Sequence, residues 1–268
     1  MIPNILSIAG SDPSGGAGIQ ADIKAISANG GYAMAVITGL TAQNTRGVTS
    51  VEMVSAPMIA AQIAAIRADI DIHAVKIGML GDVATIETVA NALEGLDAPI
   101  VLDPVMVAKG GDRLLAADAV AALRERLLPR ASVLTPNLPE AADLLRTAEA
   151  KTLDEMRDHA DQLRVKGCDA VLIKGGHLAD AMATDLLITS RGETALPAKR
   201  METPNTHGTG CTLSSALATH IGLGHALPDA AHRAKAYITG AIMAADDLSV
   251  GGGHGPVHHF YPQIENQT

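Results

Sequence analysis

The segment Gly208-Thr209-Gly210-Cys211 combines residue types that can bind an anion and accept a proton. Two glycines precede a stretch with helical period, so backbone N–H groups and a helix N-terminus can converge on a phosphate group. A thiol at a helix N-terminus tends to have a lowered pKa, which makes Cys211 a candidate general base. The plainer alternatives are an ordinary turn at the glycines and a small buried hydrophobe at Cys211. The segment matches neither the Gly-Lys-Ser/Thr nucleotide loop nor the dinucleotide fingerprint.

Two charged residues end apolar runs that are predicted to be strands, namely Asp103 and Lys174. In open α/β sheets, ligands bind beyond the carboxyl ends of the strands. We therefore expect Lys174 to meet the β- or γ-phosphate of a nucleotide, and Asp103 to orient a metal-bound water or a phosphate-contacting group. The alternatives are a turn residue at Asp103 and a strand terminus at Lys174 whose side chain reaches solvent.

Asn137 and Glu140 form an Asn-x-x-Glu unit directly after Pro136. This spacing puts both side chains in the first turn of a predicted helix. An ordinary helix start looks the same, because an acidic residue is favoured near the positive end of the helix dipole. The spacing alone leaves both a binding role and a capping role open.

Short β-branched runs alternate with longer segments of helical period, which predicts a mostly parallel central sheet covered by helices on both faces. No internal repeat and no Pro/Gly/Ser-rich linker divides residues 1–268, so we expect a single α/β domain, a three-layer αβα sandwich. Residues 180–197 look like a hairpin with Gly192 in a turn, and 251–255 like a flexible loop. The predicted strands are 5–9, 35–38, 74–77, 100–103, 133–135 and 170–174, and the predicted helices are 17–29, 57–69, 83–93, 116–127, 138–145, 153–165, 208–221 and 229–246.

The composition limits the classes of partner. A formal net charge of −9 and the lack of a basic run argue against a nucleic-acid partner. No apolar run approaches the roughly 20 residues that span a bilayer, and the first residues lack a signal-peptide pattern, so we expect a cytoplasmic protein with no membrane partner. Cys168 and Cys211 form neither a metal-type pair nor a disulfide framework, which fits a reducing compartment. We interpret Cys168 as structural.

Residues 205–214, NTHGTGCTLS, resemble the C-terminal signature of the ribokinase-like superfamily, specifically of its hydroxymethylpyrimidine/phosphomethylpyrimidine kinases of thiamine biosynthesis. Many sugar kinases of this superfamily carry Asp at the position of Cys211, and the cysteine points to the vitamin-kinase branch. The resemblance spans nearly the whole chain, because further motifs follow in the same order. These motifs are residues 9–22, 42–45, 76–80, 103–106, 135–141, 174–177 and 255–259.

The resemblance implies a ribokinase-like fold and an ATP-dependent kinase. Its substrate would be 4-amino-5-hydroxymethyl-2-methylpyrimidine, phosphorylated first to the monophosphate and then to the diphosphate. ATP and Mg²⁺ are the implied cofactors, and the superfamily commonly forms homodimers. The alternatives are a pyridoxal-type vitamin kinase and a non-catalytic binding protein of the same fold.

The resemblance also implies a pyrimidine pocket. An aminopyrimidine offers ring acceptors and an amino donor, which the Gln43 amide or the Asp22 carboxylate can match with hydrogen bonds. Met79 would form an apolar wall against the ring. Apart from the resemblance, Asp22 would be an ordinary exposed helix residue and Met79 simple core. The implied substrate-binding residues are Gly10, Ala17, Asp22, Gln43, Met79 and Val105.

The phosphate end follows from the same resemblance. The backbone N–H groups of residues 208–211 would stabilise charge on the transferred phosphoryl group, and Cys211 would take the hydroxymethyl proton. Asn137 and Glu140 would help organise Mg²⁺ through water, next to Asp103. Lys235 would reach the substrate phosphate in the second transfer, although a solvated helix face is the alternative.

Three further expectations concern motion, metals and nucleotide contacts. Residues 41–48 are polar and flanked by glycine, which suggests a mobile lid over the substrate. The histidines have no zinc-type spacing, so we predict no zinc site. The implied catalytic residues are Cys211, Gly208 and Gly210, and the implied ATP-binding residues are Lys174, Asn137, Thr209 and Lys235.

Overall fold

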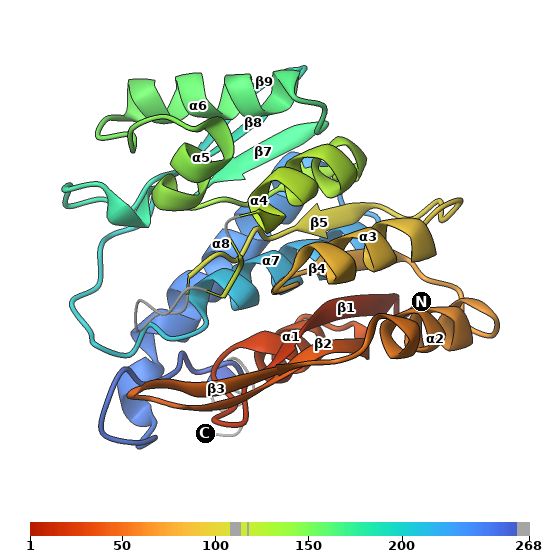
Figure 1. Ribbon diagram of the computed structural model, residues 1–268. Helices are drawn as coiled ribbons and strands as arrows, with labels where there is room; N and C mark the ends of the chain where they lie inside the picture. Colours follow the sequence, from red (N-terminus) through yellow and green to blue (C-terminus); the bar gives the residue numbers. More distant parts are fainter. Residues whose placement is uncertain (108–113, 117, 262–268) are drawn as a thin grey trace.

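A nine-stranded sheet forms the centre of the protein in a computed structural model that describes residues 1–107, 114–116 and 118–261 (Figure 1). In spatial order the strands are β3 (Gly47–Met53), β2 (Tyr32–Asn44), β1 (Asn4–Ser11), β4 (Ala74–Ile77), β5 (Ile100–Leu102), β6 (Val133–Leu134), β7 (Ala170–Ile173), β8 (Asp185–Thr189) and β9 (Gly192–Leu196). The strands from β2 across to β7 run parallel, whereas β3 at one edge and β8 and β9 at the other are antiparallel.

Helices cover both faces of this sheet (Figure 1). They are α1 (Gly18–Ala28), α2 (Ala56–Arg67), α3 (Val83–Ala92), α4 (Ala119–Ala122), α5 (Leu138–Leu145), α6 (Leu153–Val165), α7 (Thr209–Gly222) and α8 (Leu227–Met243). Helices α2 to α6 pack on one face, against strand residues such as Leu6 and Ile77. Helices α1, α7 and α8 pack on the other, against Ile5 and Val101. Because neighbours such as Ile5 and Leu6 point to opposite faces, the strands are apolar on both, as in interior parallel strands. The predicted three-layer sandwich is confirmed.

The helix predicted at 116–127 is wrong in its form. After the short α4, the chain makes a π-helical segment, η1 (Leu123–Leu127), and a 3₁₀ turn, η2 (Leu128–Arg130). Leu123 and Leu127 are buried there, and hydrophobic period over so few residues does not distinguish a π-helix from an α-helix. Residue 117 of that prediction lies outside the described residues.

The hairpin predicted at 180–197 is confirmed as β8 and β9, with Gly192 paired to Thr189 where β9 begins. At the opposite edge, the strand predicted at 35–38 is the middle of the longer β2, which pairs with the unpredicted β3. Residues 41–48 therefore form the tip of a β-hairpin, in which Gln43 pairs with Val48. Movement of this tip over a substrate stays a prediction.

The glycine run at 251–255 packs against the hairpin tip. The Gly253 N–H donates to the Thr45 hydroxyl at 3.1 Å, and the His254 N–H donates to the Thr45 carbonyl at 2.7 Å. A Cβ at Gly253 would lie 2.1 Å from that carbonyl oxygen. Close packing explains glycine here, where the sequence suggested a flexible loop. None of the helices in the described part of the chain has the length and apolarity needed to cross a bilayer.

Candidate active site

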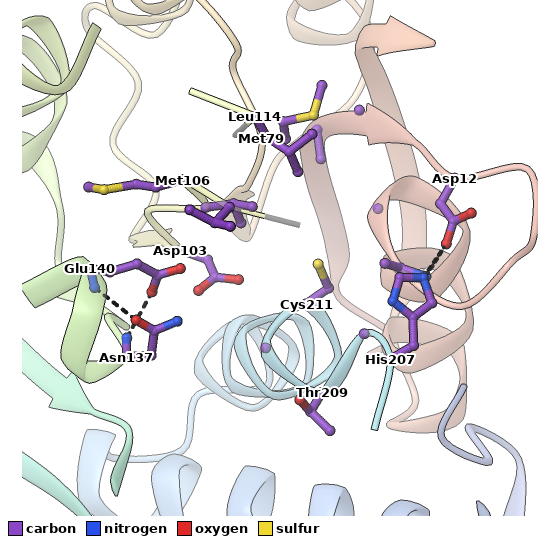
Figure 2. A pocket seen from close by; sticks show the side chains of 18 of the residues that line it. Asp12, Met79, Asp103, Met106, Leu114, Asn137, Glu140, His207, Thr209 and Cys211 are labelled. Carbon is purple, nitrogen blue, oxygen red and sulfur yellow. Dashed lines mark hydrogen bonds and ion pairs between the residues drawn. The ribbon is translucent and has the colours of Figure 1, made fainter. Parts of the chain in front are cut away.

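The strand order reverses at β1, which has β2 on one side and β4 on the other. Ligands of open α/β sheets bind where the order reverses, beyond the carboxyl ends of the strands. A cavity of about 450 Å³ lies there, with Cys211 between a group around His207 and a group around Asp103 (Figure 2). All the predicted site residues except Asp22 and Lys235 line it, namely Gly10, Ala17, Gln43, Met79, Asp103, Val105, Asn137, Glu140, Lys174, Gly208, Thr209, Gly210 and Cys211.

The glycine turn before α7 has the geometry of an anion site. Gly208 is the N-cap of α7, with φ 79° in the left-handed region that favours glycine. The Thr212 N–H donates to the Gly208 carbonyl at 2.9 Å, as expected for the residue four positions after the N-cap. The N–H groups of Gly210 and Cys211 come earlier in the helix and have no helical carbonyl to bond. These donors and the helix dipole can therefore serve a phosphate group in the cavity.

Cys211 does not have the lowered pKa that its place at a helix N-terminus predicts. Burial raises the pKa of its thiol to about 11, although the Lys76 ammonium and the Gly18 N–H act to lower it. Desolvation of the thiolate thus outweighs the helix terminus, although Cys211 is only partly buried and lines the cavity. At neutral pH the resting group is a thiol.

The other end of the cavity holds two carboxylates around one ammonium. Lys174 Nζ lies 2.9 Å from Asp103 Oδ1 and 3.8 Å from Glu140 Oε2. Burial acts to raise the pKa of Asp103, but Lys174 and Lys76 bring it below its ordinary value. Burial raises the pKa of Glu140 to about 7, because Asp103 adds to that rise and Lys174 offsets only part of it.

Asn137 and Glu140 form the helix start that was the alternative interpretation of their spacing. The Glu140 N–H donates to Asn137 Oδ1 and the Asn137 N–H to Glu140 Oε2, each at 2.8 Å, which is a complete capping box. Both residues also line the cavity. The capping role does not exclude binding, since the box fixes the two side chains at the cavity wall.

The donors at this end suit a magnesium ion. Mg²⁺ prefers oxygen ligands and is usually held by one or two carboxylates, with waters and substrate phosphates completing its shell. Asp103 and Glu140 offer two carboxylates in one cavity. Among the described residues, no group of three or more His, Cys, Asp or Glu side chains could hold a metal ion by itself. The residues fit a metal that arrives with a nucleotide.

Comparison with known proteins settles the family. The model of a family described as phosphomethylpyrimidine kinase matches residues 12–258. The chain belongs to the phosphomethylpyrimidine kinase family. A hydroxymethylpyrimidine/phosphomethylpyrimidine kinase of Rhizobium meliloti (strain 1021) is 54% identical over 256 residues, which cover 96% of each chain.

Solved structures agree with this family and with the predicted ribokinase-like fold. The ADP complex of Bacillus subtilis pyridoxal kinase superposes with a TM-score of 0.91 at 36% identity, and covers 98% of this chain and 100% of that one. The phosphomethylpyrimidine kinase from Clostridium difficile 630 superposes with a TM-score of 0.80 at 40% identity, and covers 90% of this chain and 99% of that one. Membership of this family makes the chain a kinase, and the cavity is its candidate active site.

Asp22 does not line the kinase cavity, contrary to the expectation from the resemblance. Its side chain is fully buried, and its carboxylate accepts hydrogen bonds from Lys76, Ser7 and Ser215 at 2.6–2.8 Å. A carboxylate with four such bonds has little capacity left for a pyrimidine. The earlier assignment is wrong because position on α1 alone did not show which face of the helix is covered.

The structure also places Lys235 outside the cavity, contrary to the expectation from the resemblance. Its Nζ lies 2.7 Å from Asp185 Oδ2 and donates to the Ala183 carbonyl at 2.8 Å. Asp185 in turn accepts from the Gly175 N–H at 2.9 Å. Lys235 therefore ties α8 to β8 behind the cavity, and it is not among the residues that line the cavity.

The cavity is also lined by residues that were not predicted as site residues, and Asp12 and His207 are among them. His207 Nε2 lies 2.7 Å from Asp12 Oδ2 (Figure 2). Gln43 Nε2 lies 3.4 Å from His207 Nε2. Burial acts to raise the pKa of Asp12, but hydrogen bonds from His207 and Ser14 bring it below its ordinary value. Both residues lie inside motifs that the resemblance identified. Because they are 195 positions apart, the sequence alone did not show that they are in contact.

Gly208→Ala is expected to destabilise the fold and to slow turnover at least about tenfold. A Cβ at Gly208 would lie 1.7 Å from the Gly16 carbonyl oxygen, and the left-handed φ adds about 1–3 kcal/mol of strain. Gly224→Ala is the matched control, since Gly224 has φ 86° and open space around its Cβ. It should lose stability without loss of kcat. Equal kcat for the two variants would contradict a binding role for the turn.

The raised pKa of Glu140 predicts a pH-dependent stability. Protonated Glu140 contributes its full stability below pH 4.5, and this contribution is lost as the pH rises through about 7. Glu140→Gln stays neutral and can keep the capping hydrogen bond. Between pH 5 and pH 8, the free energy of unfolding of the variant should therefore rise relative to the wild type by on the order of 2 kcal/mol. Urea titrations at both pH values measure this, and parallel pH curves would show that Glu140 is not perturbed.

Proposed function

We propose that the protein transfers the γ-phosphoryl group of ATP to the hydroxymethyl oxygen of 4-amino-5-hydroxymethyl-2-methylpyrimidine, and then a second group to the resulting monophosphate. One observation carries the proposal. Cys211 and the anion-binding turn line the same cavity as Gln43 and Met79 and as Asp103, Glu140 and Lys174, and Cys211 lies in it between His207 and Asp103 (Figure 2). A cavity of about 450 Å³ falls in the size range of small-molecule sites.

The pyrimidine is proposed to bind beside Gln43, Met79 and Val105. Met79 is 7% exposed, and Gly10 leaves room for it, because a Cβ at Gly10 would lie 2.6 Å from Met79 Cε. Gln43 supplies an amide that can both donate to a ring nitrogen and accept from the ring amino group. His207, held by Asp12, adds a second polar group at this side.

The triphosphate is proposed to lie between the anion-binding turn and Lys174. Phosphoryl transfer depends mainly on positioning and on stabilising charge on the transferred group. The Gly210 and Cys211 N–H groups and the Lys174 ammonium supply positive charge on two sides. Asn137 and Thr209 border the same space. A magnesium ion near Asp103 and Glu140 would neutralise phosphate charge when the nucleotide is bound.

Cys211 is proposed to take the proton of the substrate hydroxyl as the oxygen bonds to the γ-phosphorus. A thiolate with a parent pKa of about 11 is a strong base. Forming it is correspondingly costly, which limits the fraction of enzyme ready to react. The second transfer needs no such base, because a phosphate monoester is mostly ionised at neutral pH.

A substrate competition assay tests the proposal against the pyridoxal alternative. The purified protein is supplied with Mg-ATP and with the pyrimidine, pyridoxal or both, and ADP release is followed. Faster consumption of the pyrimidine supports the proposal, whereas faster consumption of pyridoxal supports the alternative. Absence of ADP release with either compound would favour a non-catalytic protein of this fold.

We also propose a single domain and a cytoplasmic homodimer. Both large apolar clusters share the same sheet, which supports one domain. Cys168 and Cys211 are both free, which suits a reducing compartment. Sedimentation equilibrium distinguishes a dimer from a monomer of 27.5 kDa.

A further inference from the structure

A buried ion pair lies between the sheet and α1 and is tied to α7. Lys76 Nζ, from β4, is 2.8 Å from both oxygens of Asp22, from α1. Both side chains are fully buried. Ser7 donates to the same carboxylate at 2.6 Å and Ser215 at 2.8 Å. The pair thus joins β1, β4, α1 and α7 through charged and hydroxyl groups inside an apolar core.

The pair connects directly to the helix that carries Cys211. Ser215 lies four residues after Cys211 on α7, so the two side chains share one face of the helix. Glycine at position 78 leaves space for the ammonium, because a Cβ there would lie 2.7 Å from Lys76 Nζ. Gly78 is followed by Met79 of the cavity wall. The ammonium therefore sits beneath the cavity rather than in a remote part of the core.

Four charged groups, on or directly after different elements, interact electrostatically with the Cys211 thiol. Lys76 from β4 acts to lower the pKa of the thiol, whereas Asp22 from α1 and Asp103 after β5 act to raise it. Lys174, after β7, also interacts with Cys211 electrostatically. Within the ion pair, the ammonium thus favours the thiolate and the carboxylate opposes it. The negative charges around Lys76 outweigh its burial and raise its pKa, which keeps it charged at working pH.

Stability gives no sufficient reason for such a pair. The free-energy cost of removing two charges from water often exceeds the attraction between them. Proteins in which apolar residues of similar volume replace such a pair are often as stable. Apolar residues would suit these positions as well, since Ile5, Ile8 and Ile77 on the same strands are fully buried. A charge kept beneath a reactive thiol is better explained by its effect on the thiol.

We propose that Lys76 is a positioning residue that acts through Cys211, with its ammonium held by Asp22 so that it stabilises negative charge on the sulfur. The inference rests on the proposed function. In the first transfer, the thiolate takes the hydroxyl proton while the oxygen bonds to the γ-phosphorus and the bond from phosphorus to ADP breaks. The thiol then returns its proton to water. Lys76 lowers the cost of the thiolate that starts each cycle.

Alkylation of Cys211 tests this without relying on turnover. The rate with iodoacetamide is measured between about pH 7 and pH 9.5, and the modified Cys211 peptide is quantified by mass spectrometry separately from that of Cys168. Lys76→Met should slow alkylation about tenfold at a given pH, which corresponds to about one unit of thiol pKa. Asp22→Asn should also slow it, because the fully buried Lys76 loses its proton once the carboxylate that keeps it charged is gone.

The double variant separates electrostatics from structure. Lys76→Met/Asp22→Asn removes both charges and leaves no unpaired buried ion, so a purely structural role predicts that it alkylates at the wild-type rate. The proposal predicts that the double variant folds and still alkylates several-fold more slowly than the wild type, because none of the three variants carries the ammonium. A wild-type rate in the double variant would overturn the proposal.

Turnover provides the second readout. In Lys76→Met, kcat for the alcohol should fall about tenfold and its pH profile should move to higher pH, while kcat for the monophosphate stays within about twofold. Equal losses in both transfers would contradict an action through Cys211. If the wild type phosphorylates neither pyrimidine, the proposed function fails, whereas the alkylation rates still decide the role of Lys76.

Discussion

Cys211→Ala should lower the rate of the first phosphoryl transfer by about 10²–10⁴-fold, the usual contribution of a general base. The same variant should lower the second transfer by less than about tenfold. The difference arises because an alcohol must lose a proton as it attacks, whereas a phosphate monoester, with a second pKa near 6, is already ionised. The alanine keeps the backbone N–H groups of the anion-binding turn in place for both steps.

Rates with each pyrimidine as the starting substrate, measured separately under saturating Mg-ATP, check this prediction. Cys168→Ala is the matched control, because Cys168 is buried in the apolar core and its thiol donates to the Leu163 carbonyl at 3.5 Å. Both rates in that variant should stay within about twofold of the wild type. Equal losses in the two transfers of Cys211→Ala would remove the cysteine from the role of base.

Lys174→Met should lower both transfers to a similar extent, by about 10²–10³-fold, as expected when one stabilising charge at the transferred group is lost. Its ammonium is 2.9 Å from Asp103 Oδ1 and is raised in pKa by both neighbouring carboxylates, which outweigh its burial. Without it, Asp103 and Glu140 would repel the phosphates. The common loss in both steps distinguishes Lys174 from Cys211.

Lys235→Met is the control for Lys174→Met, since it removes a lysine whose ion pair to Asp185, at 2.7 Å, lies outside the cavity. It should lower the free energy of unfolding while leaving kcat for both transfers within about twofold. Steady-state rates and urea titrations of the two variants measure both effects. A selective loss of one transfer in Lys174→Met, or a comparable loss of kcat in Lys235→Met, would contradict the account.

Local sequence features predicted several residues that line one end of the cavity. The glycine turn, the Asn137–Glu140 helix start and the charged strand ends Asp103 and Lys174 are each defined by a few neighbouring residues. Strand ends of a parallel sheet meet at one edge, so their convergence follows from the fold. The structure brings all of them to one cavity.

Long-range contacts explain what the sequence could not show. Asp22 is recruited by Lys76 and Ser215, and Lys235 by Asp185, through contacts between residues at least fifty positions apart. The lowered pKa expected for Cys211 failed for a related reason, because burial by distant segments outweighs the local helix terminus. The π-helical turn after α4 was missed because five residues are too few for their hydrophobic period to distinguish the two helix types.

Mass spectrometry of the reaction products tests the central claim most directly, namely that one cavity transfers phosphate twice and uses Cys211 as a base in the first transfer only. The wild type and Cys211→Ala are incubated with Mg-ATP and with either the pyrimidine alcohol or its monophosphate. The account predicts that the wild type converts the alcohol through the monophosphate to the diphosphate, and that Cys211→Ala converts only the monophosphate efficiently. A wild type that leaves the alcohol unmodified, or a variant that converts both substrates as the wild type does, would contradict it.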